Sequence, residues 1–292
     1  MSLSLFALQL LNGLEYGLLV FLVASGLTLI FGVMGVLNFA HGSFYMLGAY
    51  LAYWLTARTG SLWAAILIGV PVMLVVGLSV ERLAISRLYQ RDHLSQVLLT
   101  YGLILLFNEL QRALWGNEVH GVPAPAALNG ALQLGEAQTW AWYRVFTSGA
   151  CLCLAAVLWL VLQRTRIGMI VRAGASNAEM VEALGIDVRR VFALVFAAGT
   201  ALAALAGMLA APLTTVYPGM GESILVVSFV VVVIGGIGSI QGAFAGALLV
   251  GLADTFGKVL LPTIASAVVY AVMAAVLLFR PQGLLGRAPE AR

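Results

Sequence analysis

The sequence predicts an all-α polytopic membrane protein with about nine transmembrane helices, in a range of eight to ten. Hydrophobic residues make up 62% of the 292 residues and charged residues only 9%, whereas soluble domains carry about 25% charged residues. Apolar runs of about 20 residues, long enough to cross a bilayer core, recur along nearly the whole chain. No long polar segment remains for a separate soluble domain, so we expect residues 1–292 to form one integral membrane domain.

The apolar runs place the expected spans at residues 8–33, 40–57, 62–80, 94–115, 145–163, 191–211, 224–235, 242–259 and 263–279. Eleven of the fifteen basic residues fall in three segments: the loop with Arg82, Arg87 and Arg91, the loop 164–190, and the C-terminal tail. Basic loops stay on the cytoplasmic side of a membrane. We therefore expect an outer N-terminus, a cytoplasmic C-terminus and an outer loop at 116–143.

Two glycine clusters interrupt this apolar pattern. The first contains Gly32, Gly35, Asn38, His41 and Gly42, and the second contains Gly235, Gly236 and Gly238. Because backbone groups in lipid must be satisfied internally, each cluster is either a tight turn between two spans or a broken or re-entrant span beside a polar path. Their loose similarity fits an internal repeat.

The polar residues of the first cluster have two interpretations. His41 either contacts a substrate or gate, or is a structural imidazole bonded to a backbone carbonyl. Asn38 either lines the path or holds the turn and caps the next span. The orientation above places both clusters near the cytoplasmic side, where we expect close-packed joints at the inner mouth of a path.

The loop 164–190 contains a short helix signal. Ser176 with Glu179 three residues later is a capping box, and Gly185 stands where a helix stop is expected. The pattern predicts a helix of about eight residues, roughly 12 Å long. Met180, Val181 and Leu184 form an apolar stripe, while Glu179 and Glu182 face elsewhere. Such a helix either lies on the membrane or the protein's own spans, or docks on a soluble partner.

Catalytic and metal chemistry has no support in the sequence. Cys151 and Cys153, two residues apart, point away from each other on a helix. The chain has no metal-ligand spacing, no nucleophile elbow and no P-loop of the form GxxxxGK[ST]. It also lacks the basic polar face of a nucleic-acid binder. We expect no cofactor, no metal and no enzymatic activity.

Polar residues near the span ends are expected to form local pairs. Glu109 with Arg112 and Asp254 with Lys258 have the spacing of helical ion pairs. Asn12 and Glu15 share one face of the first span and either meet an external protein or lie at the interface.

Four stretches resemble one family. The segment RAGASNAEMVEALGI resembles the ATPase-coupling loop of bacterial ABC importer permeases. GLTLIFGVMGVLNFAHGSFYMLGAY, IGGIGSIQGAFAGALLVGL and LLFRPQGLLG are similar to further signature stretches of the branched-chain amino-acid permeases of the LivH type. The resemblance assigns ATPase coupling to Ser176, Asn177, Glu179, Met180, Val181, Glu182, Ala183, Leu184 and Gly185.

The resemblance also implies a machine in the bacterial inner membrane. Its other parts would be a second permease subunit (of the LivM type, or a second copy), two cytoplasmic ABC ATPases and a periplasmic solute-binding protein. An importer of urea, short amides or another small polar solute would share the same skeleton. A secondary transporter or channel without ATPases would need buried ionisable residues, which the span centres almost lack.

Overall fold

The computed structural model describes residues 3–89, 91–134 and 138–286. The long helices are α1 (Leu3–Met34), α2 (His41–Thr59), α3 (Leu62–Leu83), α4 (His93–Trp115), α5 (Trp142–Arg164), α8 (Val188–Ala210), α9 (Met220–Gly235), α10 (Ile240–Leu260) and α11 (Ala265–Phe279). The shorter elements are α6 (Arg166–Ser176), α7 (Ala178–Ala183), the 3-10 turns η1 (Ile85–Leu88), η2 (Ala126–Leu128) and η3 (Pro262–Ile264), and the antiparallel strands β1 (Ala131–Gln133) and β2 (Thr139–Ala141).

The all-α membrane fold is confirmed, and each of the nine expected spans coincides with a helix. Within the described residues, seven helices are long and apolar enough to cross a membrane. The two expected spans outside that set are α2 and the 16-residue α9. At 1.5 Å per residue, α9 is about 24 Å long, which is shorter than the hydrocarbon core. The tail residues Arg287 and Arg292, and residues 135–137 of the 116–143 loop, lie outside the described residues.

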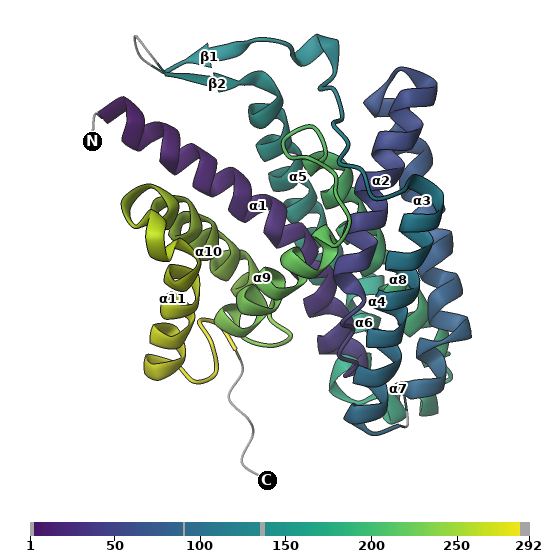
Figure 1. The fold of residues 1–292 in the computed structure, drawn as a ribbon. Helices are drawn as coiled ribbons and strands as arrows, with labels where there is room; N and C mark the ends of the chain where they lie inside the picture. Colours follow the sequence, from purple (N-terminus) through teal and green to yellow (C-terminus); the bar gives the residue numbers. More distant parts are fainter. Residues whose placement is uncertain (1–2, 90, 135–137, 287–292) are drawn as a thin grey trace.

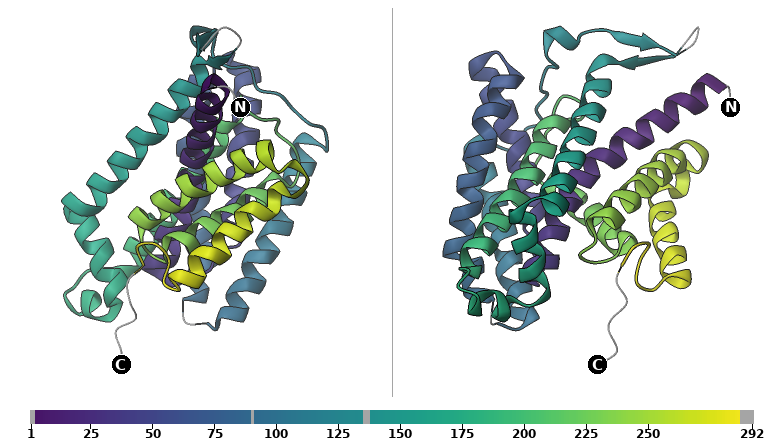
Figure 2. Two further views of the ribbon diagram at one scale, coloured as in Figure 1. Left: turned by 90° about the vertical axis from the view of Figure 1, so that its left-hand side faces the viewer. Right: turned by 180° about the vertical axis from the view of Figure 1, so that it is seen from behind.

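The helices form one bundle with two distinct ends (Figure 1). The hairpin of β1 and β2 lies at the upper end, and α7 lies at the lower end beside the connection from α3 to α4. Figure 2 shows α10 and α11 set apart from α3 and α4, with α1 running obliquely between the two groups. The basic segments that contain Arg87 and Arg172 therefore lie together at the end opposite the hairpin.

The centre of the bundle is built from α1 and α8, which are largely buried. Small residues let these helices approach their neighbours through backbone atoms. A Cβ atom on Gly26 would lie 2.4 Å from the carbonyl O of Gly199, and one on Gly207 would lie 2.0 Å from that of Tyr45. Gly199 and Gly207 thus let α8 approach α1 and α2 at backbone distance.

The outer surface of the bundle is apolar. Large exposed side chains on α3, α4, α5 and α11 include Leu67, Leu106, Leu160 and Leu278. An exposed apolar surface that extends over many helices is expected of a protein whose solvent is lipid.

Polar contacts join the hairpin to α1. Arg144 at the start of α5 forms an ion pair of 2.6 Å with Glu15, whose side chain is only 2% exposed. The indole Nε1 of Trp140 donates to Asn12 Oδ1 at 3.1 Å. The side chains of Asn12 and Glu15 therefore have polar partners within this chain. The expected pair of Asp254 and Lys258 is also present, at 2.6 Å.

The glycine contacts make a stability prediction. A Cβ on Gly48 would lie 2.2 Å from the carbonyl O of Ala204, and backbone atoms cannot move away without separating α2 from α8. We expect Gly48→Ala to destabilise the protein by about 1–3 kcal/mol and to lower its melting temperature in detergent. Gly149→Ala is the control, because Gly149 has open space around it in α5. Equal melting temperatures for the two variants would contradict the close contact.

Candidate functional site

The segment between α5 and α8 contains two helices. Thr165 caps α6, since its Oγ1 accepts a hydrogen bond from the Gly168 N–H at 3.2 Å. The side chain of Asn177 caps α7 by accepting from the Met180 N–H at 2.9 Å. The predicted capping box was therefore wrong: Ser176 ends α6 and donates to the carbonyl O of Ala173. Sequence reasoning missed α6, although Thr165 three residues before Gly168 is a usable cap signal.

The predicted stop of this helix at Gly185 is confirmed. The Gly185 N–H donates to the carbonyl O of Glu182 at 2.9 Å, and the Ile186 N–H donates to that of Val181 at 3.3 Å. This pair of bonds is a Schellman motif, which requires a left-handed residue after the helix. Gly185 has φ of +82°. The helix between the two caps has six residues and not the eight expected, because Asn177 is its N-cap and Leu184 its C-cap.

The predicted apolar stripe of α7 is divided between two faces. Val181 is 4% exposed, whereas Met180 and Leu184 are 58% and 74% exposed. Glu179, Glu182 and Ala183 are also exposed. A six-residue helix is too short to be stable alone, so Val181 anchors it to the bundle. Met180 and Leu184 remain as an apolar outer face bordered by two carboxylates.

The anchor of α7 belongs to a cluster that also packs against the end of α1. Val181 packs in a cluster with Val188 and Phe192 of α8, and Val33 and Met34 in the last turn of α1 pack against that cluster. Val181 is therefore linked to the end of α1 through this cluster.

Tyr89, just after η1, also packs against this cluster, with its ring edge-on to Phe192. The Tyr89 hydroxyl donates a hydrogen bond to the buried carboxylate of Glu81. Burial, and then the Glu81 carboxylate, hold the pKa of Tyr89 well above its ordinary value. The hydroxyl therefore keeps its proton, and the hydrogen bond fixes the connection from α3 to α4 beside α7.

Both glycine clusters are tight turns between two helices. We name residues 35–40, between α1 and α2, the first glycine turn, and residues 236–239, between α9 and α10, the second glycine turn. The structure brings their ends together, because a Cβ on Gly32 would lie 2.8 Å from the Cα of Gly238. Gly236 and Gly238 have φ of +97° and +78°, which favours glycine at both positions.

The second glycine turn is covered by the chain after α11. The Leu284 and Leu285 N–H groups donate to the carbonyl oxygens of Ile234 and Gly235, at 2.8 and 3.1 Å. These bonds satisfy two of the carbonyl groups that a helix end leaves free. The end of α9 and the start of α10 are also in close contact, since a Cβ on Gly242 would lie 1.9 Å from the carbonyl O of Gly235. Sequence reasoning did not detect this role of residues 284 and 285.

Asn38 and His41 lie buried at the first glycine turn. His41 Nε2 is 3.0 Å from the carbonyl O of Val23 in the middle of α1, and it donates because a carbonyl only accepts. Within the described chain, His41 Nδ1 and both polar atoms of the Asn38 side chain have no hydrogen-bond partner. His41 therefore ties α2 to α1. Gly42 lies against the backbone of Gly221 in the first turn of α9.

A cavity of about 420 Å³ opens beside the second glycine turn. Its walls are the C-terminal ends of α1 and α5, the half of α6 from Val171 to Ser176, and the segment from Ile237 to Gln241. Gly32 and Gly238 line it, and so does Ser176 at the end of α6. One cavity therefore touches both glycine clusters and the helix that leads into α7.

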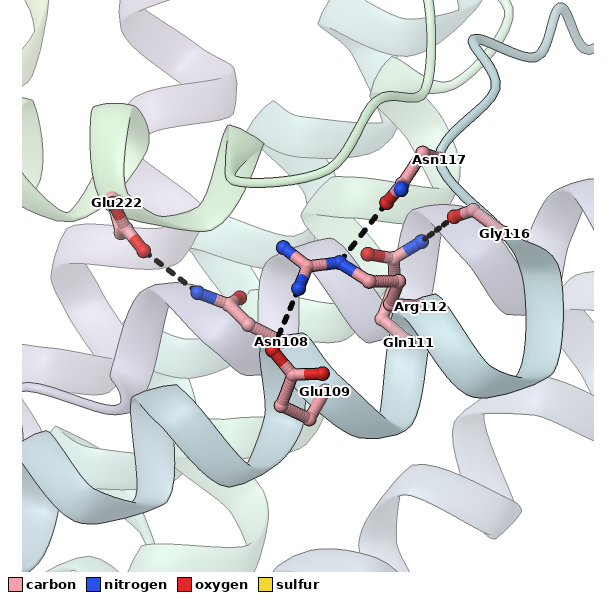
Figure 3. Close-up of polar contacts among 7 residues, drawn as sticks. All are labelled: Asn108, Glu109, Gln111, Arg112, Gly116, Asn117 and Glu222. Atoms are coloured by element: carbon pink, nitrogen blue, oxygen red, sulfur yellow. Dashed lines mark hydrogen bonds and ion pairs between the residues drawn. The ribbon is translucent and has the colours of Figure 1, made fainter.

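A separate polar cluster links α4 to α9 (Figure 3). Asn108 Nδ2 donates to Glu222 Oε1 at 2.8 Å, which joins the middle of α4 to the first turn of α9. The expected pair of Glu109 and Arg112 is present at 2.7 Å, and Arg112 Nε also donates to Asn117 at 3.0 Å. Figure 1 shows α9 near the middle of the molecule and oblique to the upright helices.

A lipid-exposed bundle with close-packed glycine turns, a cavity beside them and a projecting short helix is typical of a polytopic membrane protein of the transport class. The family described as branched-chain amino acid transport system / permease component matches residues 9–279. The chain belongs to this family.

Individual relatives match over nearly the whole chain. The high-affinity branched-chain amino acid transport system permease protein BraD of Pseudomonas aeruginosa is 34% identical, over 97% of this chain and 96% of its own. The corresponding LivH protein of Escherichia coli K12 is 31% identical, over 98% and 96% of the two chains. A probable LivH permease of Methanocaldococcus jannaschii is 29% identical, over 93% and 90%.

The cap of α7 is testable by hydrogen exchange. Asn177→Ala removes the acceptor of the Met180 N–H and should destabilise this short helix by about 1 kcal/mol. We expect exchange of the Met180 amide to become about fivefold faster, while Asn177→Asp restores the acceptor and the slower rate. Ser176→Ala is the control and should leave the rate unchanged. If Ser176→Ala accelerates exchange of the Met180 amide and Asn177→Ala does not, Ser176 and not Asn177 is the N-cap.

Proposed function

We propose that this protein is a permease subunit of an ATP-driven importer for branched-chain or related amino acids in a bacterial inner membrane. Family membership supports the transport class. The observation that carries the ATP-driven mechanism is the geometry of α7: Val181 is buried against the bundle, while Met180 and Leu184 are presented outward. A capped helix with one anchored and one free apolar face fits a groove on a soluble partner.

The proposed assembly has further subunits. Two cytoplasmic ABC ATPases would bind and hydrolyse ATP, because this chain has no P-loop. A periplasmic binding protein would deliver the solute, and a second permease subunit, LivM-type or a second copy, would complete the path. The protein itself acts as a transport subunit and not as an enzyme.

The coupling route follows the observed contacts. Closure of the ATPases would displace α7, whose Val181 packs against the cluster that Val33 and Met34 join. Those two residues end α1, directly before the first glycine turn. The second glycine turn touches the same end of α1 through Gly32 and Gly238. A shift of α7 would therefore be transmitted to both turns. The proposed gate consists of two sets of residues: Asn38, His41 and Gly42 at the first turn, and Gly235, Gly236 and Gly238 at the second.

Importers of urea, short amides or other small polar solutes remain the alternative within the same class, since the coupling geometry does not select the solute. An ATPase-independent transporter has less support. Of the buried carboxylates in the described residues, Glu15 is paired with Arg144 near the hairpin, and Glu81 is bonded to Tyr89 near α7. Neither carboxylate is free for ion coupling.

The double variant Met180→Asp with Leu184→Asp tests the coupling role. It charges the outer face of α7 and leaves the buried Val181 in place, so the permease should fold normally. We expect loss of ATPase co-purification, or ATP hydrolysis uncoupled from leucine uptake, with uptake reduced at least tenfold. Leu132→Asp, on the exposed hairpin at the other end, is the control. Unchanged uptake in the double variant would refute this role.

Orientation is testable by cysteine labelling in a Cys153→Ser background. Ala131→Cys on β1 should react with a membrane-impermeant maleimide added from the periplasm. Ala183→Cys on α7 should react only after the cytoplasmic side is opened, because both positions are exposed but lie at opposite ends. The reverse pattern would overturn the proposed topology.

A further inference from the structure

The cavity beside the second glycine turn contains polar groups that the protein leaves unused. Thr28 is 1% exposed, lines the cavity, and its Oγ1 has no hydrogen-bond partner within the described residues. A buried hydroxyl without a partner is costly, at about 1–3 kcal/mol. A helical threonine often bonds the carbonyl one turn earlier, as Thr100 does with Gln96. The Thr28 hydroxyl is therefore available for a hydrogen bond to a group that the described chain does not supply.

Among the described residues, one exposed cation lines the same cavity. Arg172 on α6 lines it and has no ion pair or hydrogen bond in the part of the chain that the structure describes. The lining contains no aspartate or glutamate. An arginine fork without a protein carboxylate is suited to bind the carboxylate of a ligand.

Besides the indole of Trp159, most of the remaining side chains of the lining are of two kinds. Neutral polar side chains are supplied by Gln163, Ser239 and Gln241. The apolar part of the lining consists of branched aliphatic side chains, namely Leu29, Val33, Leu162, Val171, Ile237, Ile240 and Leu285. A volume of about 420 Å³ is within the range of small-molecule sites, which combine apolar walls with a few polar groups.

We propose that this cavity is a binding site for a small monocarboxylate with an aliphatic side chain. Arg172 takes the carboxylate, the aliphatic walls take the side chain, and the neutral oxygens of Thr28 and the glutamines accept from an ammonium group. With the proposed function, on which this assignment of the ligand rests, the occupant is a branched-chain amino acid leaving toward the cytoplasm. Without a carboxylate to pair the ammonium, the site binds weakly, as release requires.

The walls connect this site to α7. Ala175 and Ser176 line the cavity, and the next residue, Asn177, is the cap of α7. The second glycine turn forms another part of the lining and contacts Gly32 near the end of α1. Displacement of α7 would pull the last turn of α6 relative to that turn and change the width of the site.

Ligand protection of an introduced cysteine tests the site without transport. Ala175→Cys, in the Cys153→Ser background and in the assembled complex in nanodiscs, is labelled with a maleimide in the presence of leucine, lysine or glycerol 3-phosphate. We expect leucine alone to slow labelling, and Arg172→Gln to weaken the leucine effect about tenfold, as loss of a charged hydrogen bond does. Arg166→Gln, an exposed arginine of α6 outside the lining, should not change it.

Two other outcomes would overturn the proposal. Protection by glycerol 3-phosphate and not by leucine would show that the cavity binds a lipid headgroup. Protection by neither compound would show that the cavity does not bind small carboxylates. ATP-driven leucine uptake by the unmodified complex is measured in parallel. Uptake without leucine protection refutes the site alone, whereas absence of uptake refutes the proposed function.

Discussion

Close backbone contact between helices is the constraint on which this structure depends. Lipid supplies no hydrophobic force that pushes apolar helices together, so packing must come from short distances and shape. Here the contacts are made where side chains are absent: Gly26 on Gly199, Gly48 on Ala204 and Gly32 on Gly238. These contacts bury α1 and α8 at the centre and leave the leucine-rich faces of α3, α4, α5 and α11 for lipid.

The same contacts explain how a small external helix would act on a large bundle. Interfaces packed at backbone distance do not deform continuously, so a displacement moves whole elements. The anchor Val181 packs in a cluster that Met34 joins, and Met34 precedes the first glycine turn. From there the contact of Gly32 with Gly238 leads to the second turn and to the cavity. Coupling, gate and ligand site are thus proposed along one continuous set of contacts.

Local signals were predictable because they depend on neighbouring residues. Apolar run length located the nine helices, and the expected helix stop at Gly185 was correct because a Schellman motif needs a left-handed residue there. The cap of α7 was misplaced by one residue, since Ser176 and Asn177 are both good caps and the competing helix α6 takes Ser176 as its last residue. The split of the apolar stripe could not be predicted, because periodicity does not say which side faces the bundle.

By itself, the sequence determined the class of protein: its composition requires lipid, its apolar runs require helices, and its glycine clusters require turns between them. The tertiary structure alone decided which turns meet, which polar groups are left without partners, and which residues line a cavity. Thr28 and Arg172 are 144 positions apart, as their numbers show, and no local pattern links them. They share a cavity only because α6 folds back on α5 and α1, at the point where Gly168 permits contact with the carbonyl O of Leu162.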